Sequence, residues 1–199
     1  MDKRIAITGG IGSGKSYVLQ TLDKLGFATF SCDEIYKDVI KDAKYTQKIA
    51  EIFPVVVENG SINRKKLAEI VFNDEKCRKK LNDIAHPFIM SRLYALMDDT
   101  KSALKFAEVP LLFEGGFEKD FDGIIVVQRA ENDRIQAVCA RDGLTQKEVE
   151  SRIKSQIAIN NWLQTKQTVP VWIIDNDKDK KALEENIAQT LLQIQKRLS

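Results

Sequence analysis

Short apolar runs alternate along the chain with longer segments in which apolar residues recur every three or four positions. Runs rich in β-branched and aromatic residues predict buried strands, and the segments between them predict amphipathic helices. Such an alternation is typical of a parallel sheet with helices on both faces. We therefore expect a three-layer α/β fold. The five predicted strands are Arg4–Thr8, Phe27–Ser31, Lys105–Val109, Gly123–Gln128 and Val171–Ile174.

Two segments predict helices that pack on this sheet. Over Lys15–Leu25, apolar residues recur at helical spacing, and Gly26 stands where a residue in the left-handed conformation would end the helix. Near the end of the chain, an apolar stripe predicts a final helix whose inner face packs on the sheet. Its residues are Leu183, Ile187, Leu191, Ile194 and Leu198.

Residues 33–102 differ from the rest, because their pattern is almost wholly helical. We expect breaks at Pro54, at the turn Asn59-Gly60 and at Pro87. The segment predicts a helical lobe inserted between the second and third strands. Since no repeat and no flexible linker separates it, we expect one domain over residues 1–199. Its parts are a core (1–32, 103–130 and 171–199), the lobe (33–102) and a lid region (131–170).

The charge balance restricts the partners. Thirty-one lysines and arginines nearly cancel 29 aspartates and glutamates, and the formal net charge is +2. We therefore expect no general attraction to nucleic acid or membrane. No apolar run approaches a membrane span or a secretion signal, which predicts a cytoplasmic protein. The three cysteines, Cys32, Cys77 and Cys139, lie far apart and predict reduced thiols.

The stretch that follows the first strand carries the clearest chemistry. Gly9, Gly14, Lys15 and Ser16 fit G-x-x-x-x-G-K-[ST] between a predicted strand and a predicted helix. In such a P-loop, backbone N–H groups surround a polyphosphate, the lysine reaches the β- and γ-phosphates, and the serine hydroxyl binds Mg²⁺. The residues that we expect to bind the nucleotide are Ile11, Gly12, Ser13, Gly14, Lys15, Ser16 and Tyr17.

The loop alone does not distinguish kinases from GTPases, ATPase motors and switches. Asp120–Gly123 fits the D-x-x-G pattern of GTPases, but no Asn-Lys-x-Asp guanine reader follows it. A motor would show a strand that ends in Asp-Glu, and the stretch Pro110–Glu114 offers one acid. A small-molecule kinase needs an acidic residue near the γ-phosphate, an acceptor pocket and arginines over the phosphates. We favour this class.

Candidates for these parts follow the second and fourth strands. Asp33 lies at the carboxyl edge of the sheet, where ligands bind in open α/β folds. Composition alone favours it as the N-cap of the next helix, and an acceptor-orienting acid is the alternative. A capping box beginning at Thr145 and a loop near Gly143 predict two short helices that form a mobile lid. Its candidate arginines, each of which could also lie on a solvated helix face, are Arg129, Arg134, Arg141 and Arg152.

Taken together, these residues resemble the dephospho-coenzyme A kinase family. The matching stretches follow one another in the family's order across almost the whole chain. They are Ile7–Ser16, Asp33–Ile35, His86-Pro87, Val109–Glu114, Arg141–Thr145 with Gln156, and Ile174–Asn176.

The resemblance implies a P-loop kinase fold and transfer of phosphate from ATP to the ribose 3′-hydroxyl of dephospho-coenzyme A. It implies that Asp33 takes up or orients the hydroxyl proton and that Lys15 and Arg141 stabilise the transferring phosphoryl group. It also implies that Ser16 binds Mg²⁺ and that Asn176, with Asp175, borders the adenine of ATP. The residues that it places along the acceptor are His86, Leu111 and Glu114, together with Asp33.

The chain departs from the family pattern at several positions. Ser31 and Tyr17 stand where the family commonly has aspartate and threonine. Ala137 replaces a usual arginine, which leaves either Arg134 as its substitute or a lid that closes less tightly. The stretch 157–171 is longer and more polar than is usual. A kinase of another small hydroxylated metabolite and a non-catalytic ATP-binding switch stay open as alternatives.

Overall fold

The structure is a computed structural model that describes residues 2–154, 156, 159–165 and 167–198. The chain forms two compact units, and each is described by itself. The first unit comprises residues 1–30 and 101–199, and the second comprises residues 31–100.

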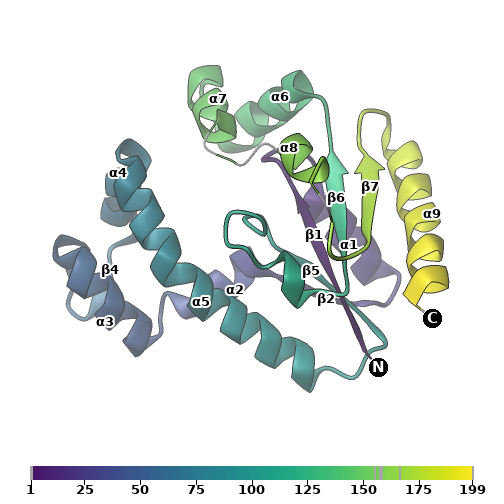
Figure 1. Ribbon diagram of the computed structural model, residues 1–199. Coiled ribbons are helices and arrows are strands. Elements are labelled where there is room, and N and C mark those ends of the chain that lie inside the picture. The colour runs from purple at the N-terminus through teal and green to yellow at the C-terminus, as the bar shows by residue number, and fades with distance from the viewer. Residues whose placement is uncertain (1, 155, 157–158, 166, 199) are drawn as a thin grey trace. The chain divides into compact units, whose positions relative to one another are not determined.

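The first unit is built on a five-stranded parallel sheet (Figure 1). Its strands are β1 (Lys3–Gly9), β2 (Ala28–Ser31), β5 (Leu104–Glu108), β6 (Gly123–Gln128) and β7 (Val171–Asp175), in the order β2-β5-β1-β6-β7. In the register of the central strands, Ile5 lies opposite Phe106 on one side and Gly123 on the other. The predicted strands and the α/β class are confirmed, each strand end to within one residue.

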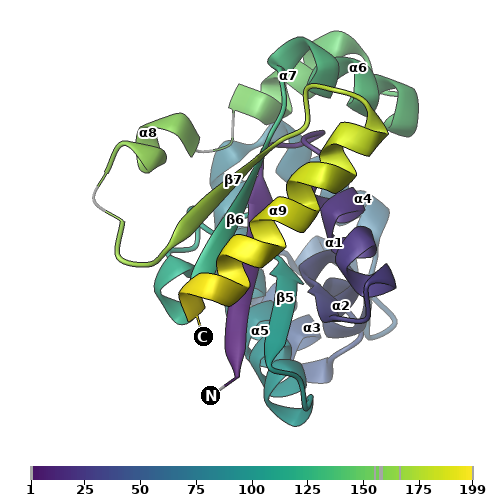
Figure 2. The same ribbon diagram turned by 90° about the vertical axis from the view of Figure 1, so that its right-hand side faces the viewer.

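The core of this unit lies between the sheet and two helices. Helices α1 (Lys15–Lys24) and α9 (Lys180–Leu198) share one hydrophobic cluster with the strands. Figure 2 shows α9 running alongside β7. The predicted stripe of α9 belongs to this cluster, which confirms it as core. Because every residue of β1 from Ile5 to Gly9 is buried, both faces of the central strand are covered.

Local sequence signals end and begin the helices of this unit. Gly26 is left-handed at φ 86°, with hydrogen bonds Gly26 N to Asp23 O and Phe27 N to Leu22 O that complete a Schellman motif. The lid region contains α6 (Glu131–Asp142), α7 (Gln146–Lys154) and α8 (Ile159–Leu163). Gly143 ends α6 in the left-handed conformation. The predicted capping box is present, because the Glu148 carboxylate accepts from the Thr145 N–H at 2.8 Å.

The second unit is mainly helical. Its elements are α2 (Cys32–Val39), α3 (Ala43–Ile52), a 3-10 helix (Pro54–Val56), β3 (Val57–Glu58), β4 (Ser61–Ile62), α4 (Arg64–Asn73) and α5 (Glu75–Asp99). Asn59 and Gly60 both have positive φ and form the two-residue turn between β3 and β4. Among the described residues, no helix is both long enough and apolar enough to cross a membrane.

The expected break at Pro87 is wrong, because α5 runs through this residue. Proline removes one helical hydrogen bond and costs about 3 kcal/mol in a helix interior. Packing on both sides of Pro87 offsets this cost. Ala85 and Met90 are buried, and the Phe88 ring packs edge-on against Tyr45 with their centroids 5.3 Å apart.

Candidate active site

The P-loop joins β1 to α1 and holds its lysine close to the backbone. The ammonium of Lys15 donates to the carbonyl oxygens of Gly9 and Gly10, each at 3.0 Å, and the residue is 8% exposed. Gly14, the N-cap of α1, has φ 101°, which favours glycine. The loop therefore places a buried positive charge beside the N-terminus of a helix, an arrangement suited to a polyphosphate.

The next residue of the loop contacts an acid that sequence reasoning missed. The Ser16 hydroxyl donates to Glu108 Oε1 at 3.0 Å, and Glu108 is 5% exposed at the end of β5. The overlooked signal was a single carboxylate at the end of an apolar strand, before Val109-Pro110. Because β5 lies next to β1 in the sheet, this carboxylate and the Ser16 hydroxyl meet at the carboxyl edge.

The end of β7 supports the P-loop. The Asn176 side chain donates to the Ser13 carbonyl oxygen at 2.8 Å, and its backbone N–H donates to the Gln128 carbonyl oxygen at 2.9 Å. A Cβ added at Gly14 would lie 2.4 Å from Asn176 Nδ2, so the packing at this position also requires glycine. Asn176 is thus tied to the loop, and its backbone lies between Asp175 and Asp177.

The lid region also packs against the P-loop, at Ile11 and Gly12. The Ile11 backbone N–H donates to Gln156 Oε1 at 2.8 Å, although the two residues are 145 positions apart. The Ile11 side chain packs against an apolar cluster of α6 and α7 that includes Val138 and Val149. At Gly12, an added Cβ would lie 2.9 Å from Val138 Cγ2. Gln156 is therefore a second residue at the P-loop to which sequence reasoning gave no role.

A cleft of about 520 Å³ opens beside the loop, within the first unit. Its walls come from the start of the P-loop, the residues after β6, helices α6 and α7 with Gln156 and Ile159, and the end of β7. Such a volume is typical of a small-molecule site. Of the predicted nucleotide-binding residues, Ser13 lines the cleft directly.

The arginines of the lid region have different surroundings. The side chain of Arg134 is 15% exposed and lines the cleft, so the solvated-face interpretation is wrong for this residue. The side chain of Arg141 is 63% exposed, and its guanidinium donates to both carboxylate oxygens of Asp142, at 2.7 and 2.9 Å. These hydrogen bonds hold the pKa of Asp142 below its usual value.

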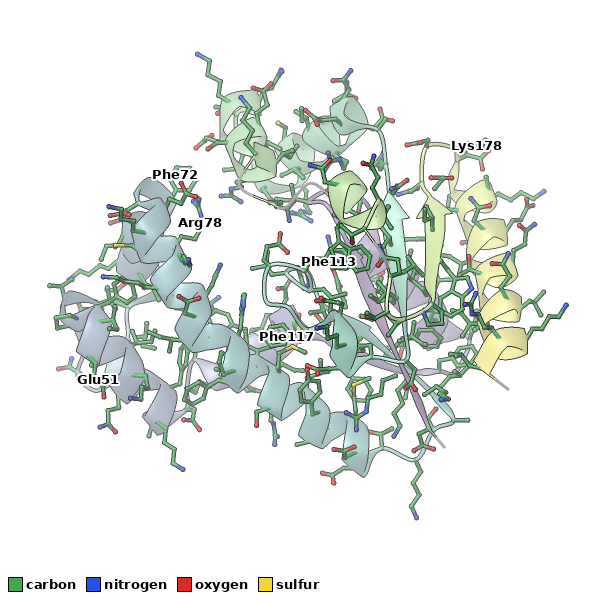
Figure 3. The ribbon with its side chains drawn as sticks, in the orientation of Figure 1. Glu51, Phe72, Arg78, Phe113, Phe117 and Lys178 are labelled. Atoms are coloured by element: carbon green, nitrogen blue, oxygen red, sulfur yellow. The ribbon has the colours of Figure 1, made fainter. Side chains whose placement is uncertain are left out.

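The predicted acceptor residues of the first unit lie in the turn after β5. Leu111 is partly buried and Glu114 is exposed. Figure 3 labels two aromatic side chains of this turn, Phe113 and Phe117. Phe113 stacks on Trp162 of α8 with the ring centroids 3.8 Å apart, so an aromatic pair joins this turn to the lid region.

Asp33 and His86 belong to the second unit. Helix α2 begins at Cys32 and its N-cap is Ser31, whose hydroxyl accepts from the Glu34 N–H at 3.4 Å. The interpretation of Asp33 as the N-cap is therefore wrong, and its carboxylate is exposed in the first turn of α2. His86 lies within α5, where burial lowers the pKa of its imidazole.

The structure thus brings Lys15, Ser16 and Asn176 together around one loop with Glu108, Gln156 and Arg134. Tyr17 lies one residue further on in α1; its N–H donates to the Gly14 carbonyl oxygen at 3.0 Å and its hydroxyl donates to Glu184 at 2.5 Å.

Comparison with known proteins gives the same family over most of the chain. A family model described as dephospho-CoA kinase matches residues 3–195. The chain is 36% identical over 156 residues to a dephospho-CoA kinase of Fusobacterium nucleatum, covering 77% of this chain and 81% of that protein. It is 32% identical over 200 residues to a dephospho-CoA kinase of Staphylococcus epidermidis, covering 96% of this chain and 95% of that protein.

Two solved structures are similar in fold. The dephospho-CoA kinase of Campylobacter jejuni has a TM-score of 0.68 and 28% identity, covering all of both chains. A protein of Thermus thermophilus has a TM-score of 0.82 and 29% identity, covering 96% of this chain and 97% of that one. With the family model matching nearly the full length and two relatives more than 30% identical over most of the chain, the chain belongs to the dephospho-CoA kinase family.

Proposed function

We propose that this protein transfers the γ-phosphoryl group of ATP to the ribose 3′-hydroxyl of dephospho-coenzyme A, which gives coenzyme A and ADP, the last step of coenzyme A synthesis. The observation that carries the proposal is a complete P-loop, with a buried lysine, in a chain of the dephospho-CoA kinase family. A cytoplasmic location suits this reaction.

The P-loop and its cleft would hold ATP. When phosphate enters, its oxygens replace the carbonyl oxygens of Gly9 and Gly10 as partners of the Lys15 ammonium. The backbone of Asn176 would border the adenine, because Asp175 and Asp177 on either side of it line the cleft. The Asn176 side chain, which is bonded to the P-loop, would keep the loop in the shape that phosphate requires.

The residues beside the loop fit Mg²⁺, which prefers oxygen ligands and keeps several waters. A hydroxyl and a buried carboxylate, those of Ser16 and Glu108, meet where the β- and γ-phosphates are expected. In kinase sites, Mg²⁺ is usually held by one or two carboxylates together with substrate phosphates and waters. When bound, Mg²⁺ neutralises charge on the transferring phosphoryl group. Ser16 would bind it, and Glu108 would accept hydrogen bonds from its waters.

The second unit would carry the acceptor as the helical lobe (33–102). The exposed carboxylate of Asp33 would accept the proton of the 3′-hydroxyl as the new O–P bond forms and the bond to ADP breaks. His86, Leu111 and Glu114 would contact dephospho-coenzyme A. Because burial disfavours the imidazolium, His86 would meet the acceptor as a neutral side chain.

The lid region (131–170) would exclude water from the phosphates. Arg141 would exchange its hydrogen bonds to Asp142 for the transferring phosphoryl group, whose charge spreads over the outer oxygens. If closure depends on the acceptor, ATP is protected from hydrolysis until dephospho-coenzyme A is bound. We therefore expect weak ATPase activity without acceptor.

The test is to offer Mg²⁺, ATP and, separately, dephospho-coenzyme A, adenosine and pantetheine, and to follow ADP and every phosphorylated product by mass spectrometry. We expect transfer to dephospho-coenzyme A, loss of transfer in Asp33→Asn, and normal transfer in Asp38→Asn, an exposed aspartate on the same helix. Preferred transfer to another acceptor would favour a kinase of a different metabolite. Tight ATP binding with no transfer, unchanged in Asp33→Asn, would favour a switch.

A further inference from the structure

Arg134 of α6 lies directly against the P-loop with both its side chain and its backbone. A Cβ added at Gly10 would lie 2.1 Å from Arg134 Nη1, so the guanidinium fills the space that a side chain at this position would need. A Cβ added at Gly12 would lie 2.7 Å from the Arg134 carbonyl oxygen. Two glycines of the loop thus lie directly against Arg134, one against its guanidinium and one against its backbone.

The surroundings of this guanidinium leave its charge incompletely paired. Arg134 Nε is buried with no hydrogen-bond partner among the described residues, and the ion pair to Glu131 is 3.5 Å long. The Glu131 side chain is 64% exposed, so water weakens this pair. Arg129, on the same cleft, also has a buried Nε without a partner in the described chain. Buried guanidinium groups with open donors indicate a site that binds an anion.

The loop also indicates which phosphate Arg134 faces. Gly10, against which the guanidinium lies, supplies one of the two carbonyl oxygens that bind the Lys15 ammonium. In a P-loop the lysine reaches the β- and γ-phosphates, whereas the backbone N–H groups of the glycine-rich loop hold the α- and β-phosphates. The guanidinium therefore lies at the start of the loop, beside the carbonyl oxygen that binds the Lys15 ammonium, and the terminal phosphate is expected next to that ammonium.

We propose that Arg134 binds the γ-phosphate of ATP and is the lid arginine already placed at the P-loop, whereas Arg141 is paired with Asp142. This inference rests on the proposed function for its ligand, ATP, and adds a residue that confers preference for triphosphate over diphosphate. A planar guanidinium can donate two hydrogen bonds to one phosphate, which lysine cannot match. The preference lets ADP leave after transfer, because the contact is lost with the γ-phosphoryl group.

The test measures the dissociation constants of ATP and ADP by titration calorimetry, without acceptor, for the wild type and the variants. We expect Arg134→Ala to weaken ATP binding by roughly 10- to 100-fold, and ADP binding by less than about threefold, since one charge-assisted contact to the γ-phosphate is lost. Glu131→Gln removes the ion-pair partner, and Arg197→Ala removes an exposed arginine of α9. Both should stay within about threefold of the wild type for each nucleotide.

Equal weakening of ATP and ADP in Arg134→Ala, or no weakening, would overturn the assignment. A loss as large in Glu131→Gln would overturn it too, because the ion pair alone would then explain the effect. If Arg134→Ala does not fold, Arg134→Lys takes its place, with a reduced ratio of ATP to ADP affinity expected and an unchanged ratio contradicting the proposal. Since no acceptor is present, these results are separate from failure to form coenzyme A.

Discussion

Replacing Asn176 by alanine tests whether this side chain acts through the P-loop. The change removes the donor that binds the Ser13 carbonyl oxygen at 2.8 Å and leaves the backbone bond to Gln128 in place. A partly buried neutral hydrogen bond is worth about 1 kcal/mol net, which corresponds to about fivefold in an equilibrium constant. We expect the free energy of unfolding to fall by about this amount. We also expect phosphate affinity to fall by up to about fivefold, because binding must restore the loop.

The assay titrates ATP and inorganic tripolyphosphate, which has no base, against wild type, Asn176→Ala and Asn186→Ala. Asn186 of α9 is a matched control, because its side chain also donates to a backbone carbonyl oxygen, but to that of Asp175 at 3.0 Å rather than to one in the P-loop. The affinities of the two ligands should fall equally in Asn176→Ala and stay unchanged in Asn186→Ala. If Asn176→Ala lowers the affinity for ATP but not for tripolyphosphate, the reasoning is refuted, because the side chain would then act on the adenine.

Three further predictions follow from buried groups. Glu108→Gln keeps an acceptor for Ser16 but removes the negative charge, so the gain in ATP affinity on adding Mg²⁺ should fall by about tenfold. The control Glu185→Gln changes an exposed glutamate and should leave this gain unchanged. An unchanged gain in Glu108→Gln would exclude a role of Glu108 with the metal. Gly123→Ala places a Cβ 2.5 Å from the Trp172 ring in the core, so urea unfolding should show a free energy of unfolding that is about 1–3 kcal/mol lower. A decrease below about 0.5 kcal/mol would contradict the packing around this residue. His86 is the chain's one histidine, and burial lowers the pKa of its imidazole in the folded protein. Near pH of about 6.5 and below, the unfolded protein therefore binds more protons at His86 than the folded protein does. The free energy of unfolding should fall as the pH drops from about 7.5 to about 5.5. In His86→Gln the free energy of unfolding should fall less over this pH range. If it falls equally in the wild type and the variant, His86 does not cause the fall.

The strands and the P-loop could be predicted because their signals are local. Buried parallel strands are short and apolar, and Gly14, Lys15 and Ser16 form a fixed spacing between a strand and a helix. The Schellman ending at Gly26 and the capping box at Thr145 are likewise set by residues that are neighbours in sequence. For such features, the interactions that decide the structure lie within a few residues.

The missed features depend on residues far apart in the sequence. Nothing near Gln156 indicates that its carboxamide reaches Ile11, and a polar residue on a helix, such as Arg134, is usually solvated. Pro87 was expected to break its helix because the local cost is known but the packing around it is not. Ser31 rather than Asp33 is the N-cap of α2 because this helix begins directly after β2, with no loop between them.

The measurement that tests the central claim most directly is phosphorus NMR of the products formed from ATP, Mg²⁺ and dephospho-coenzyme A. The account predicts one new phosphate monoester on the ribose 3′-hydroxyl for each ADP formed. Lys15→Ala should lower the rate by about 100-fold or more, and Lys24→Ala, which changes an exposed lysine at the other end of α1, should leave it unchanged. ATP consumption without the 3′-monoester, or equal rates for Lys15→Ala and wild type, would contradict it.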